Sequence, residues 1–195
     1  MSKVLIVIDA QEDFTYGTLR NKEAMEALPV IRKITNLAKE NKAKIIYTKD
    51  THHNNYLETQ EGKNLPIKHC IKGTFGWELC DEAVVENYPY DVIEKETFGF
   101  SGWDKHRQYE TVSDILLADE VWMCGFCTDI CVMANFQMLK AFYPELPIII
   151  IKDGCAGVTP ELHEAALKVM GSCQAIIKSF DELKTEIEND CSGSM

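Results

Sequence analysis

Short runs of apolar and β-branched residues recur along the chain, and most of them end at a polar or charged residue. In order, they read KVLIVID at 3–9, KIIYTKD at 44–50, YDVIEK at 90–95, EVWMCGF at 120–126, LPIIIIKDG at 146–154 and QAIIKS at 174–179. Runs of this length and composition are typical of β-strands. The first run lacks alternation between apolar and polar residues, which indicates a central parallel strand buried on both faces.

The segments between these runs favour amphipathic helices. After Pro29, apolar residues recur at helical spacing through Ala38, and a proline near the first turn fits a helix that begins there. Further helices are predicted over 101–118, over 130–142, from 159 and from 179. Thr159 is a candidate cap for the third of these. The S-x-x-E pattern of Ser179 and Glu182 predicts a capping box at the start of the last one.

Strands that alternate with helices predict βαβ units, and these units build a parallel sheet covered by helices on both faces. The expected fold is therefore a single-domain, doubly wound α/β sheet with three layers, α/β/α. The chain has 195 residues and contains no internal repeat or low-complexity linker. We accordingly predict one domain over 1–190, followed by a frayed tail at 191–195.

Acidic residues outnumber basic ones, with 31 Asp and Glu against 20 Lys and Arg and a formal net charge of −11. This balance argues against nucleic acid or an anionic membrane surface as a partner. The apolar runs are shorter than the roughly 18 residues that span a bilayer, and the first is too short for a secretory signal. Eight cysteines are too sparse for a disulfide-stapled secreted domain. We expect a cytoplasmic protein with reduced thiols.

Four chemically active side chains fall where predicted strands end. Asp9, Asp50 and Lys95 close three of the runs, and Cys131 follows a fourth through GFCTDIC at 125–131. Ligands of doubly wound sheets bind outside the carboxyl ends of strands, so these groups are expected at one edge. Cys131 would lie near a helix N-terminus that favours a thiolate, with Asp9 as its base and Lys95 as a tuning cation. Taken singly, each residue also fits a structural role.

A second polar group follows the strand that ends at Asp50. The sequence DTHH at 50–53 gives an Asp-x-His pair, and His69 supplies a later histidine. Two imidazoles and a carboxylate suit Zn, Mn or Fe, with positions left for water or substrate. His53 is expected to be a bystander because its side chain points away from that of His52 in an extended segment. The alternative is a polar loop with exposed histidines.

The cysteines near 124–131 allow two other interpretations. Cys124, Cys127 and Cys131 form a C-x2-C-x3-C pattern that could hold a metal ion or cluster, although no second C-x-x-C exists. A cysteine-based redox sensor would use the C-x-x-C at 124–127, which lies in a strand and is expected to be too buried to cycle freely.

Five segments carry a family resemblance. They are VIDAQEDF at 7–14, KDTH at 49–52, HCIKGT at 69–74, Lys95, and GFCTDIC at 125–131. Together they resemble the isochorismatase-like cysteine hydrolases over nearly the whole chain, and within that family they are most similar to the nicotinamidases, also called pyrazinamidases.

The resemblance assigns roles to two groups of residues. It implies a catalytic triad of Asp9, Lys95 and Cys131, and a divalent metal ion, with Zn expected first and Mn or Fe as alternatives, held by Asp50, His52 and His69. Some relatives add a glutamate to the metal ligands, and Glu61 matches that position better than Glu58. A cis peptide between Phe126 and Cys127 and a homo-oligomeric assembly are also implied.

The implied function is hydrolysis of a small-molecule amide, with nicotinamide converted to nicotinate and ammonia through a thioester on Cys131. Backbone N–H groups of Cys127 and Cys131 would hold the oxyanion, and Phe14, Leu65 and Phe126 would line the substrate pocket. Nicotinamidases commonly carry an aromatic residue and two prolines before the metal histidine, whereas this chain has Leu65 there. One alternative is therefore another small amide or carbamoyl compound, and another is a non-catalytic relative that binds a small molecule or metal.

Overall fold

The computed structural model describes residues 2–105 and 110–192 and contains a six-stranded sheet. Its strands are β1 (Lys3–Ile8), β2 (Lys44–Asp50), β3 (Asp91–Lys95), β4 (Glu120–Phe126), β5 (Ile148–Ala156) and β6 (Ile176–Lys178). All neighbouring pairs are parallel, in the order β3-β2-β1-β4-β5-β6. The chain leaves β1 in one direction and returns to its other side through β4. This is the switch point at which ligands of doubly wound sheets bind.

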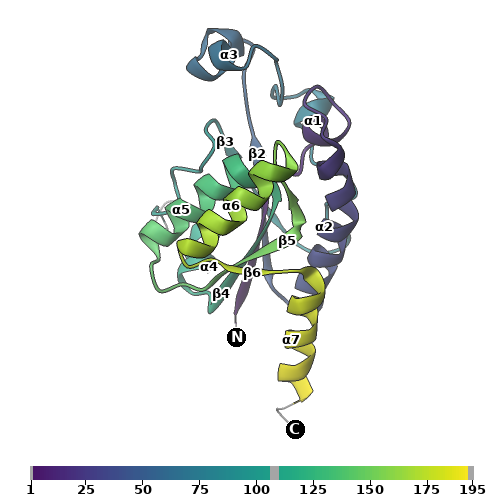
Figure 1. Ribbon diagram of the computed structural model, residues 1–195, viewed down its shortest axis with the longest axis vertical. Helices are drawn as coiled ribbons and strands as arrows, with labels where there is room; N and C mark the ends of the chain where they lie inside the picture. Colours follow the sequence, from purple (N-terminus) through teal and green to yellow (C-terminus); the bar gives the residue numbers. More distant parts are fainter. Residues whose placement is uncertain (1, 106–109, 193–195) are drawn as a thin grey trace.

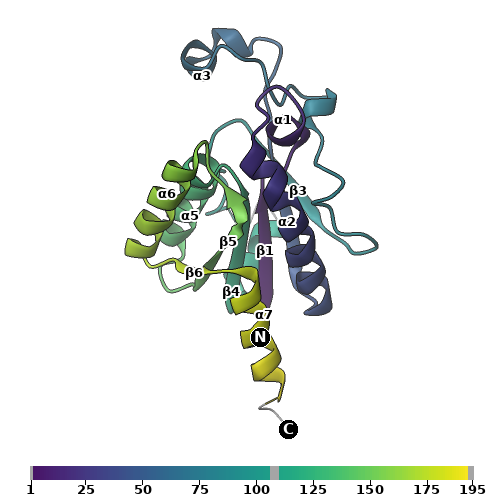
Figure 2. The same cartoon turned by 45° about the vertical axis from the view of Figure 1, so that its right-hand side comes forward.

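Helices cover both faces of the sheet (Figures 1 and 2). On one face α2 (Lys22–Glu40) packs against the central strands and against α7 (Phe180–Ser192). The other face carries α4 (Glu110–Leu116), α5 (Met133–Phe142) and α6 (Pro160–Ser172). Shorter elements are α1 (Glu12–Thr15), α3 (Gln60–Asn64) and the 3₁₀ turns η1 (Tyr56–Glu58) and η2 (Phe75–Trp77). The predicted three-layer, doubly wound fold is confirmed.

The core lies on both faces of the central strands. Leu5, Ile6, Val7 and Ile8 of β1 have no exposed surface, which agrees with the unbroken apolar run there. β1 pairs with β2 on one side and β4 on the other, so its backbone hydrogen bonds are also satisfied. Each such buried aliphatic side chain stabilises the fold by about 1.5–3 kcal/mol relative to exposure. The sheet therefore forms a rigid base for the side chains that follow its strands.

The first long helix starts earlier than the sequence predicts. The Asn21 side chain caps α2 by accepting a hydrogen bond from the N–H of Ala24 at 3.1 Å, so the helix begins at Lys22. Pro29 lies inside α2 at an exposed position and does not mark its start. The prediction was wrong because Ala24, Ala27 and Leu28 extend the apolar face upstream of the proline.

Two predicted helices are shorter in the structure. Of the helix predicted over 101–118, α4 covers Glu110–Leu116; residues 101–104 form a turn and 106–109 lie outside the described residues. The helix predicted over 130–142 starts with a π-helical turn, η3 (Thr128–Val132), before α5 begins at Met133. This turn is the local geometry that presents Cys131.

The predicted helix caps near the C-terminus are confirmed. Thr159 accepts a hydrogen bond from the N–H of Leu162 at 3.2 Å. The N–H of Ser179 donates to Glu182 at 2.6 Å, and the N–H of Glu182 donates back to Ser179 at 3.2 Å. α7 then continues to Ser192, so it includes the first two residues of the predicted tail at 191–195; residues 193–195 lie outside the described residues.

The connection between β2 and β3 lies beyond the carboxyl ends of the strands, with α3 at its far end (Figure 1). The N–H of His52 donates to the carbonyl of Cys70 at 2.9 Å, and the N–H of Lys72 donates to the carbonyl of His52 at 2.9 Å. These bonds close the loop and bring His69 beside His52. Within the described residues, we find no helix with the length and apolar character needed to cross a membrane.

Candidate functional site

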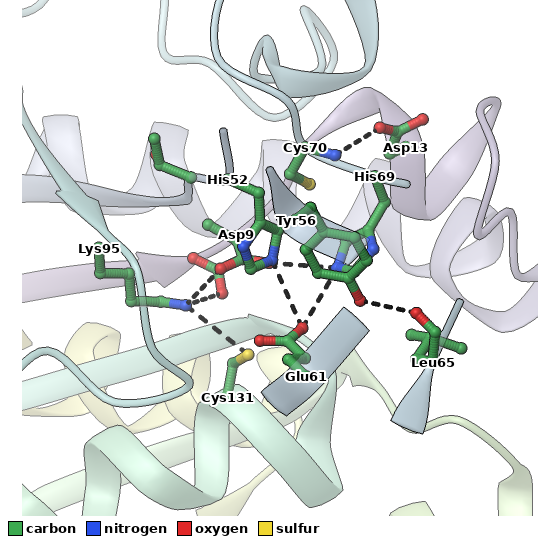
Figure 3. A network of polar contacts seen from close by, with 12 residues as sticks. Asp9, Asp13, His52, Tyr56, Glu61, Leu65, His69, Cys70, Lys95 and Cys131 are labelled. Atoms are coloured by element: carbon green, nitrogen blue, oxygen red, sulfur yellow. Dashed lines mark hydrogen bonds and ion pairs between the residues drawn. The ribbon is translucent and has the colours of Figure 1, made fainter. Parts of the chain in front are cut away.

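Lys95 contacts three of the polar side chains that follow the strands, and Figure 3 shows its amino group directed toward Asp9 and Cys131. Its Nζ lies 2.6 Å from Oδ2 of Asp9, 3.7 Å from Oδ1 of Asp50 and 3.7 Å from Sγ of Cys131. Asp9 follows β1, Asp50 and Lys95 end the adjacent strands β2 and β3, and Cys131 sits in η3 after β4. All four are at most 5% exposed. The structure thus brings together the strand-end residues that the sequence singled out.

Asp9 is held in an unusual backbone conformation and by a direct hydrogen bond. Its φ is 47°, a left-handed value that Asp tolerates better than most residues. The Thr48 hydroxyl donates to Oδ1 of Asp9 at 2.6 Å. Burial raises the pKa of Asp9, and the nearby Lys95 and Thr48 offset only part of that rise. A carboxyl with a raised pKa is a better proton acceptor than an ordinary aspartate.

Lys95 remains charged despite its burial. Burial lowers the pKa of its ammonium group, but the charges of Asp9, Cys131 and Asp50 outweigh this effect, so the net shift is upward. A buried cation with these neighbours can stabilise negative charge on either the carboxylate or the sulfur.

The Cys131 thiol differs from the sequence expectation. Burial raises its pKa well above the ordinary value, and the opposing charge of Lys95 does not cancel that effect. The expected thiolate at a helix N-terminus is therefore not the resting form, since the sulfur is desolvated in a π-helical turn. The Asn135 side chain fixes this turn by donating to the carbonyl of Cys131 at 2.7 Å. The resting site pairs a neutral thiol with a buried base.

A second cluster gathers beside these groups from β2 and the connection after it. One ligand atom each from Asp50, His52, Glu61 and His69 lies within 4.8 Å of all the others. Nε2 of His52 is 3.1 Å from Asp50 and 3.4 Å from Glu61, and Nε2 of His69 is 3.5 and 3.6 Å from the same carboxylates. These four residues form a group that could hold a metal ion.

The donor chemistry of the cluster fits a divalent ion. Nδ1 of His69 contacts the carbonyl of Ile67 at 2.9 Å, which leaves Nε2 free to bind a metal. Nε2 of His52 is fully buried and has no hydrogen bond of acceptable geometry, although Asp50 and Glu61 are close. Burial lowers the pKa of His52, but these carboxylates raise it to about 9 overall. Two imidazoles and two carboxylates converging on one point suit Zn, Mn or Fe.

Two side chains that the sequence did not single out support this cluster. Gln11 accepts from the N–H of Asp50 at 2.7 Å and donates to its carbonyl at 2.9 Å. Tyr56 packs against the rings of His52 and His69, with centroids 4.6 and 5.0 Å away, and donates its hydroxyl hydrogen to the carbonyl of Leu65 at 2.9 Å. Gln11 lies within the VIDAQEDF motif, but its contact with the backbone of Asp50 could not be predicted, because such a contact does not follow from the spacing of apolar and polar residues.

The structure also bears on three other interpretations of the sequence: His53 as a bystander, a C-x2-C-x3-C metal site and a C-x-x-C redox pair. His53 is 54% exposed in its side chain, faces Glu96 at 3.1 Å and lies outside the metal group, as the bystander prediction requires. The metal-competent group found among the described residues contains no cysteine, so the structure does not support a C-x2-C-x3-C site for a single metal ion. Cys124 is fully buried within β4, which also removes it from a freely cycling C-x-x-C.

A cavity of about 550 Å³ opens onto both clusters. Phe14, Leu65, Cys127 and Cys131 line it, together with Asp50, Glu61 and His69 of the metal group. Phe98 also lines it. Phe126 was predicted to line the pocket, but it has no exposed surface and belongs to the core instead. The cis peptide between Phe126 and Cys127 is present as predicted.

Comparisons with known proteins agree with this architecture. The isochorismatase domain model matches residues 3–182. A nicotinamidase/pyrazinamidase from Bacillus subtilis is 26% identical, with a TM-score of 0.77, covering 92% of this chain and 100% of that chain. A pyrazinamidase of Pyrococcus horikoshii, solved in complex with zinc, is 26% identical, with a TM-score of 0.76 and the same coverage.

A third solved structure has a different printed activity. N-carbamoylsarcosine amidase from Thermoplasma acidophilum is 25% identical, with a TM-score of 0.72, covering 92% of this chain and 96% of that chain. A comparison with curated protein sequences gives no significant match. Because the family model spans nearly all of a chain that has this fold and this arrangement of strand-end residues, the protein belongs to the isochorismatase family of hydrolases.

Proposed function

We propose that the protein is a metal-containing cysteine amidohydrolase that cleaves a small primary amide, with nicotinamide converted to nicotinate and ammonia as the first candidate reaction. The observation that carries this proposal is the position of Lys95, within 3.7 Å of Cys131 and 2.6 Å of Asp9, beside a metal-competent cluster. The nucleophile Cys131 thus lines the cavity, and Lys95 links it to the base Asp9 just behind the cavity wall. The similarity to solved nicotinamidases supports the same reaction class.

In the first half-reaction, Asp9 accepts the thiol proton as Sγ of Cys131 attacks the amide carbon. Burial raises the pKa of the thiol and favours its neutral form at rest, so this proton moves as the sulfur attacks. Lys95 stabilises the developing thiolate from 3.7 Å. Backbone N–H groups of Cys127 and Cys131 hold the oxyanion, and each such donor contributes roughly 2.7–4 kcal/mol to transition-state stabilisation. Asp9 then returns the proton to the leaving ammonia.

In the second half-reaction, water hydrolyses the thioester. Asp9 accepts a proton from the attacking water, and Cys131 leaves as the sulfur–carbon bond breaks. Asp9 then returns this proton to the departing sulfur, so the carboxylic acid is released and the site regains a neutral thiol and an ionised Asp9. Because one carboxylate serves both halves, its ionisation governs the acid side of the pH profile.

In this proposal, the metal cluster positions the substrate and does not supply the reacting groups. Asp50, His52, Glu61 and His69 would hold the ion, whose chemistry when bound would be a Lewis-acidic contact that anchors the substrate. Its ligands lie beside the cavity wall that contains Cys131, so an anchored ring would place its carboxamide near the sulfur. The reacting groups themselves remain Cys131 and Asp9.

A second candidate function is favoured by one cavity residue. Leu65 lines the cavity and is 36% exposed, at the position where an aromatic residue would stack on a pyridine ring. An aliphatic side chain offers no such stacking. Hydrolysis of another small amide or a carbamoyl compound is therefore the alternative, and the 25% identity to an N-carbamoylsarcosine amidase supports it.

The decisive experiment measures ammonia release from nicotinamide by the metal-loaded protein and by Cys131→Ala. We expect the variant to lose at least 10³-fold in kcat, because the nucleophile of a covalent mechanism has no substitute. Cys173→Ala is the matched control, since that cysteine lies at the end of α6 and does not line the cavity. Substantial turnover by Cys131→Ala would remove the thioester mechanism.

A parallel assay separates the two candidate substrates. Turnover of an N-carbamoyl amino acid without turnover of nicotinamide, still dependent on Cys131, would establish the second candidate. Retained ligand binding with no release of ammonia from either compound, and a Cys131 that resists thiol reagents, would instead indicate a non-catalytic binding protein.

A further inference from the structure

The cavity is larger than one small ring requires. Its volume of about 550 Å³ falls within the range of sites that enclose drug-sized ligands. A nicotinamide bound between the metal cluster and Cys131 would leave part of this space unfilled. The additional wall comes from residues 18–24, which connect α1 to the first turn of α2.

This connection is held firmly against the rest of the site. Oδ1 of Asp13 accepts from the N–H of Thr18 at 2.9 Å, and Oδ2 of Asp13 accepts from the N–H of Cys70 at 2.7 Å. The N–H of Asn21 donates to Phe14 at 3.0 Å, and its side chain donates to the carbonyl of Gly157 at 2.8 Å. One buried carboxylate therefore ties the connection to the segment that carries His69 (Figure 3). Arg20 lies between these anchors, and its own N–H donates to the carbonyl of Gly17 at 3.3 Å, which fixes its backbone position.

Arg20 lines the cavity and lacks an ionic partner. Within residues 2–105 and 110–192, no carboxylate lies within ion-pair distance of its guanidinium, even though the chain carries an excess of acidic residues. Other cations of the same region are paired: Arg32 contacts Glu86 at 2.6 Å, and Lys22 contacts Glu26 at 3.3 Å. The cavity wall thus carries two cations, Arg20 and Lys22; Lys22 is paired with Glu26, whereas Arg20 has no ion-pair partner among the described residues.

We propose that the preferred substrate is a small amide that also carries a carboxylate, and that Arg20 binds this carboxylate as a specificity-determining residue. A guanidinium presents a planar pair of N–H donors that matches a carboxylate. Arg20 and Cys131 line the same cavity, so a ligand whose carboxylate meets Arg20 can place its amide near Cys131. This inference rests on the proposed amidase function and narrows its substrate class.

The test compares substrates that differ only in charge. Malonamate, succinamate and glutaramate are each assayed beside the corresponding neutral diamide, because the three lengths sample the distance between Cys131 and Arg20. For the metal-loaded full-length protein, we expect kcat/KM for at least one of the acids to exceed that of its diamide by about tenfold, as for a hydrogen bond to a charged group. Added salt reduces the preference because Arg20 is exposed.

Two arginine variants test whether a preference for the acid depends on Arg20. Arg20→Ala should abolish the preference for the acid over its diamide, whereas Arg32→Ala should retain it, because Arg32 lies within α2 and does not line the cavity. Cys131-dependent hydrolysis with no preference for the acid, or a preference that survives Arg20→Ala, would overturn this inference and leave the amidase function intact.

A binding measurement keeps the inference testable if no amide is hydrolysed. Calorimetry with Cys131→Ala compares succinamate with succinamide, and the same comparison is made with Arg20→Ala added. Tighter binding of the acid that depends on Arg20 would support the carboxylate site even where the proposed hydrolysis fails. Equal binding of the two compounds would overturn it.

Discussion

Thr48 shows how a single side chain tunes the proposed base. Its hydroxyl donates to Asp9 at 2.6 Å and lowers the pKa of a carboxyl that burial raises. The N–H of Asp9 also donates to the carbonyl of Thr48 at 3.2 Å, so the backbone stays satisfied without the hydroxyl. Thr48→Val therefore removes this contact with the carboxylate, together with the hydrogen bond that the hydroxyl accepts from the N–H of Asp9 at 3.1 Å, at nearly constant shape.

We expect Thr48→Val to move the acid limb of the kcat/KM profile to higher pH. Loss of a hydrogen bond to the carboxylate form raises the pKa of Asp9 further, so the base is protonated over a wider range. If the Thr48 hydrogen bond stabilises the carboxylate form of Asp9 by about 1 kcal/mol, its loss moves the midpoint of the acid limb upward by about 0.7 pH unit. The measurement is kcat/KM from pH 4 to 9.

Thr35→Val is the control for this prediction, because Thr35 is also buried but bonds within α2 to the carbonyl of Arg32. Its profile should match that of the unmodified protein. A uniform fall in rate by Thr48→Val with an unchanged midpoint would show that the hydroxyl acts on geometry and not on the pKa of Asp9.

At the scale of elements, α2 contains a local conflict. Pro29 lies inside a helix of 19 residues, where it cannot donate a hydrogen bond to the carbonyl four residues earlier. The helix persists because its apolar face, including Ile31 and Ile34, is completely buried against the sheet. Packing outweighs propensity here, as it often does in long amphipathic helices.

Pro29→Ala should accordingly stabilise the protein. An interior proline costs a helix up to about 3 kcal/mol relative to alanine, and the proline's restriction of the unfolded chain offsets up to about 1 kcal/mol. We expect the free energy of unfolding to rise by about 2 kcal/mol in urea titrations, with unchanged activity. A lower stability would mean that the helix depends on the proline ring or on a bend that it imposes.

The elements also show what the sequence could and could not predict. Strand positions were predicted well because buried parallel strands require unbroken apolar runs, and the capping box of Ser179 and Glu182 is a purely local signal. The start of α2 was not predicted correctly, because Pro29 fits the first turn of a helix. The Asn21 cap is identified only by its hydrogen bond with the N–H of Ala24. Phe126 was misplaced because a residue next to the catalytic loop can still point into the core.

For the whole molecule, the doubly wound topology explains why strand-end residues were the productive ones to inspect. Parallel strands direct their carboxyl ends to one edge, so Asp9, Asp50 and Lys95 meet without any local motif. Gln11 and Thr48 were not predicted, because their roles depend on contacts across 39 residues of sequence. The role proposed for Arg20 could not be predicted from the sequence for the same reason, because only the folded chain shows that its guanidinium has no ion-pair partner among the described residues.

The metal cluster joins the sheet to the connection that lies above it, so an ion there should affect the whole fold. Asp50 belongs to β2, whereas Glu61 and His69 come from the connection after it. Removal of the ion by a chelator should lower Tm, since a ligand at 100 times its Kd stabilises the native state by about 2.7 kcal/mol. Zn, Mn or Fe should restore it, and calorimetry with each ion measures the order of preference.

The same cluster predicts how binding depends on pH. Its carboxylates raise the pKa of His52 to about 9, so in the ion-free protein this ring is protonated at neutral pH and must lose its proton to bind a metal. Affinity should therefore fall as pH decreases from 9, with protons released on metal addition. His52→Ala should abolish the rise in Tm that metal addition causes. His53→Ala, at an exposed neighbouring position, should retain this rise. Equal effects of the two variants, or a Tm that does not respond to metal, would mean that these four side chains converge for structural reasons alone.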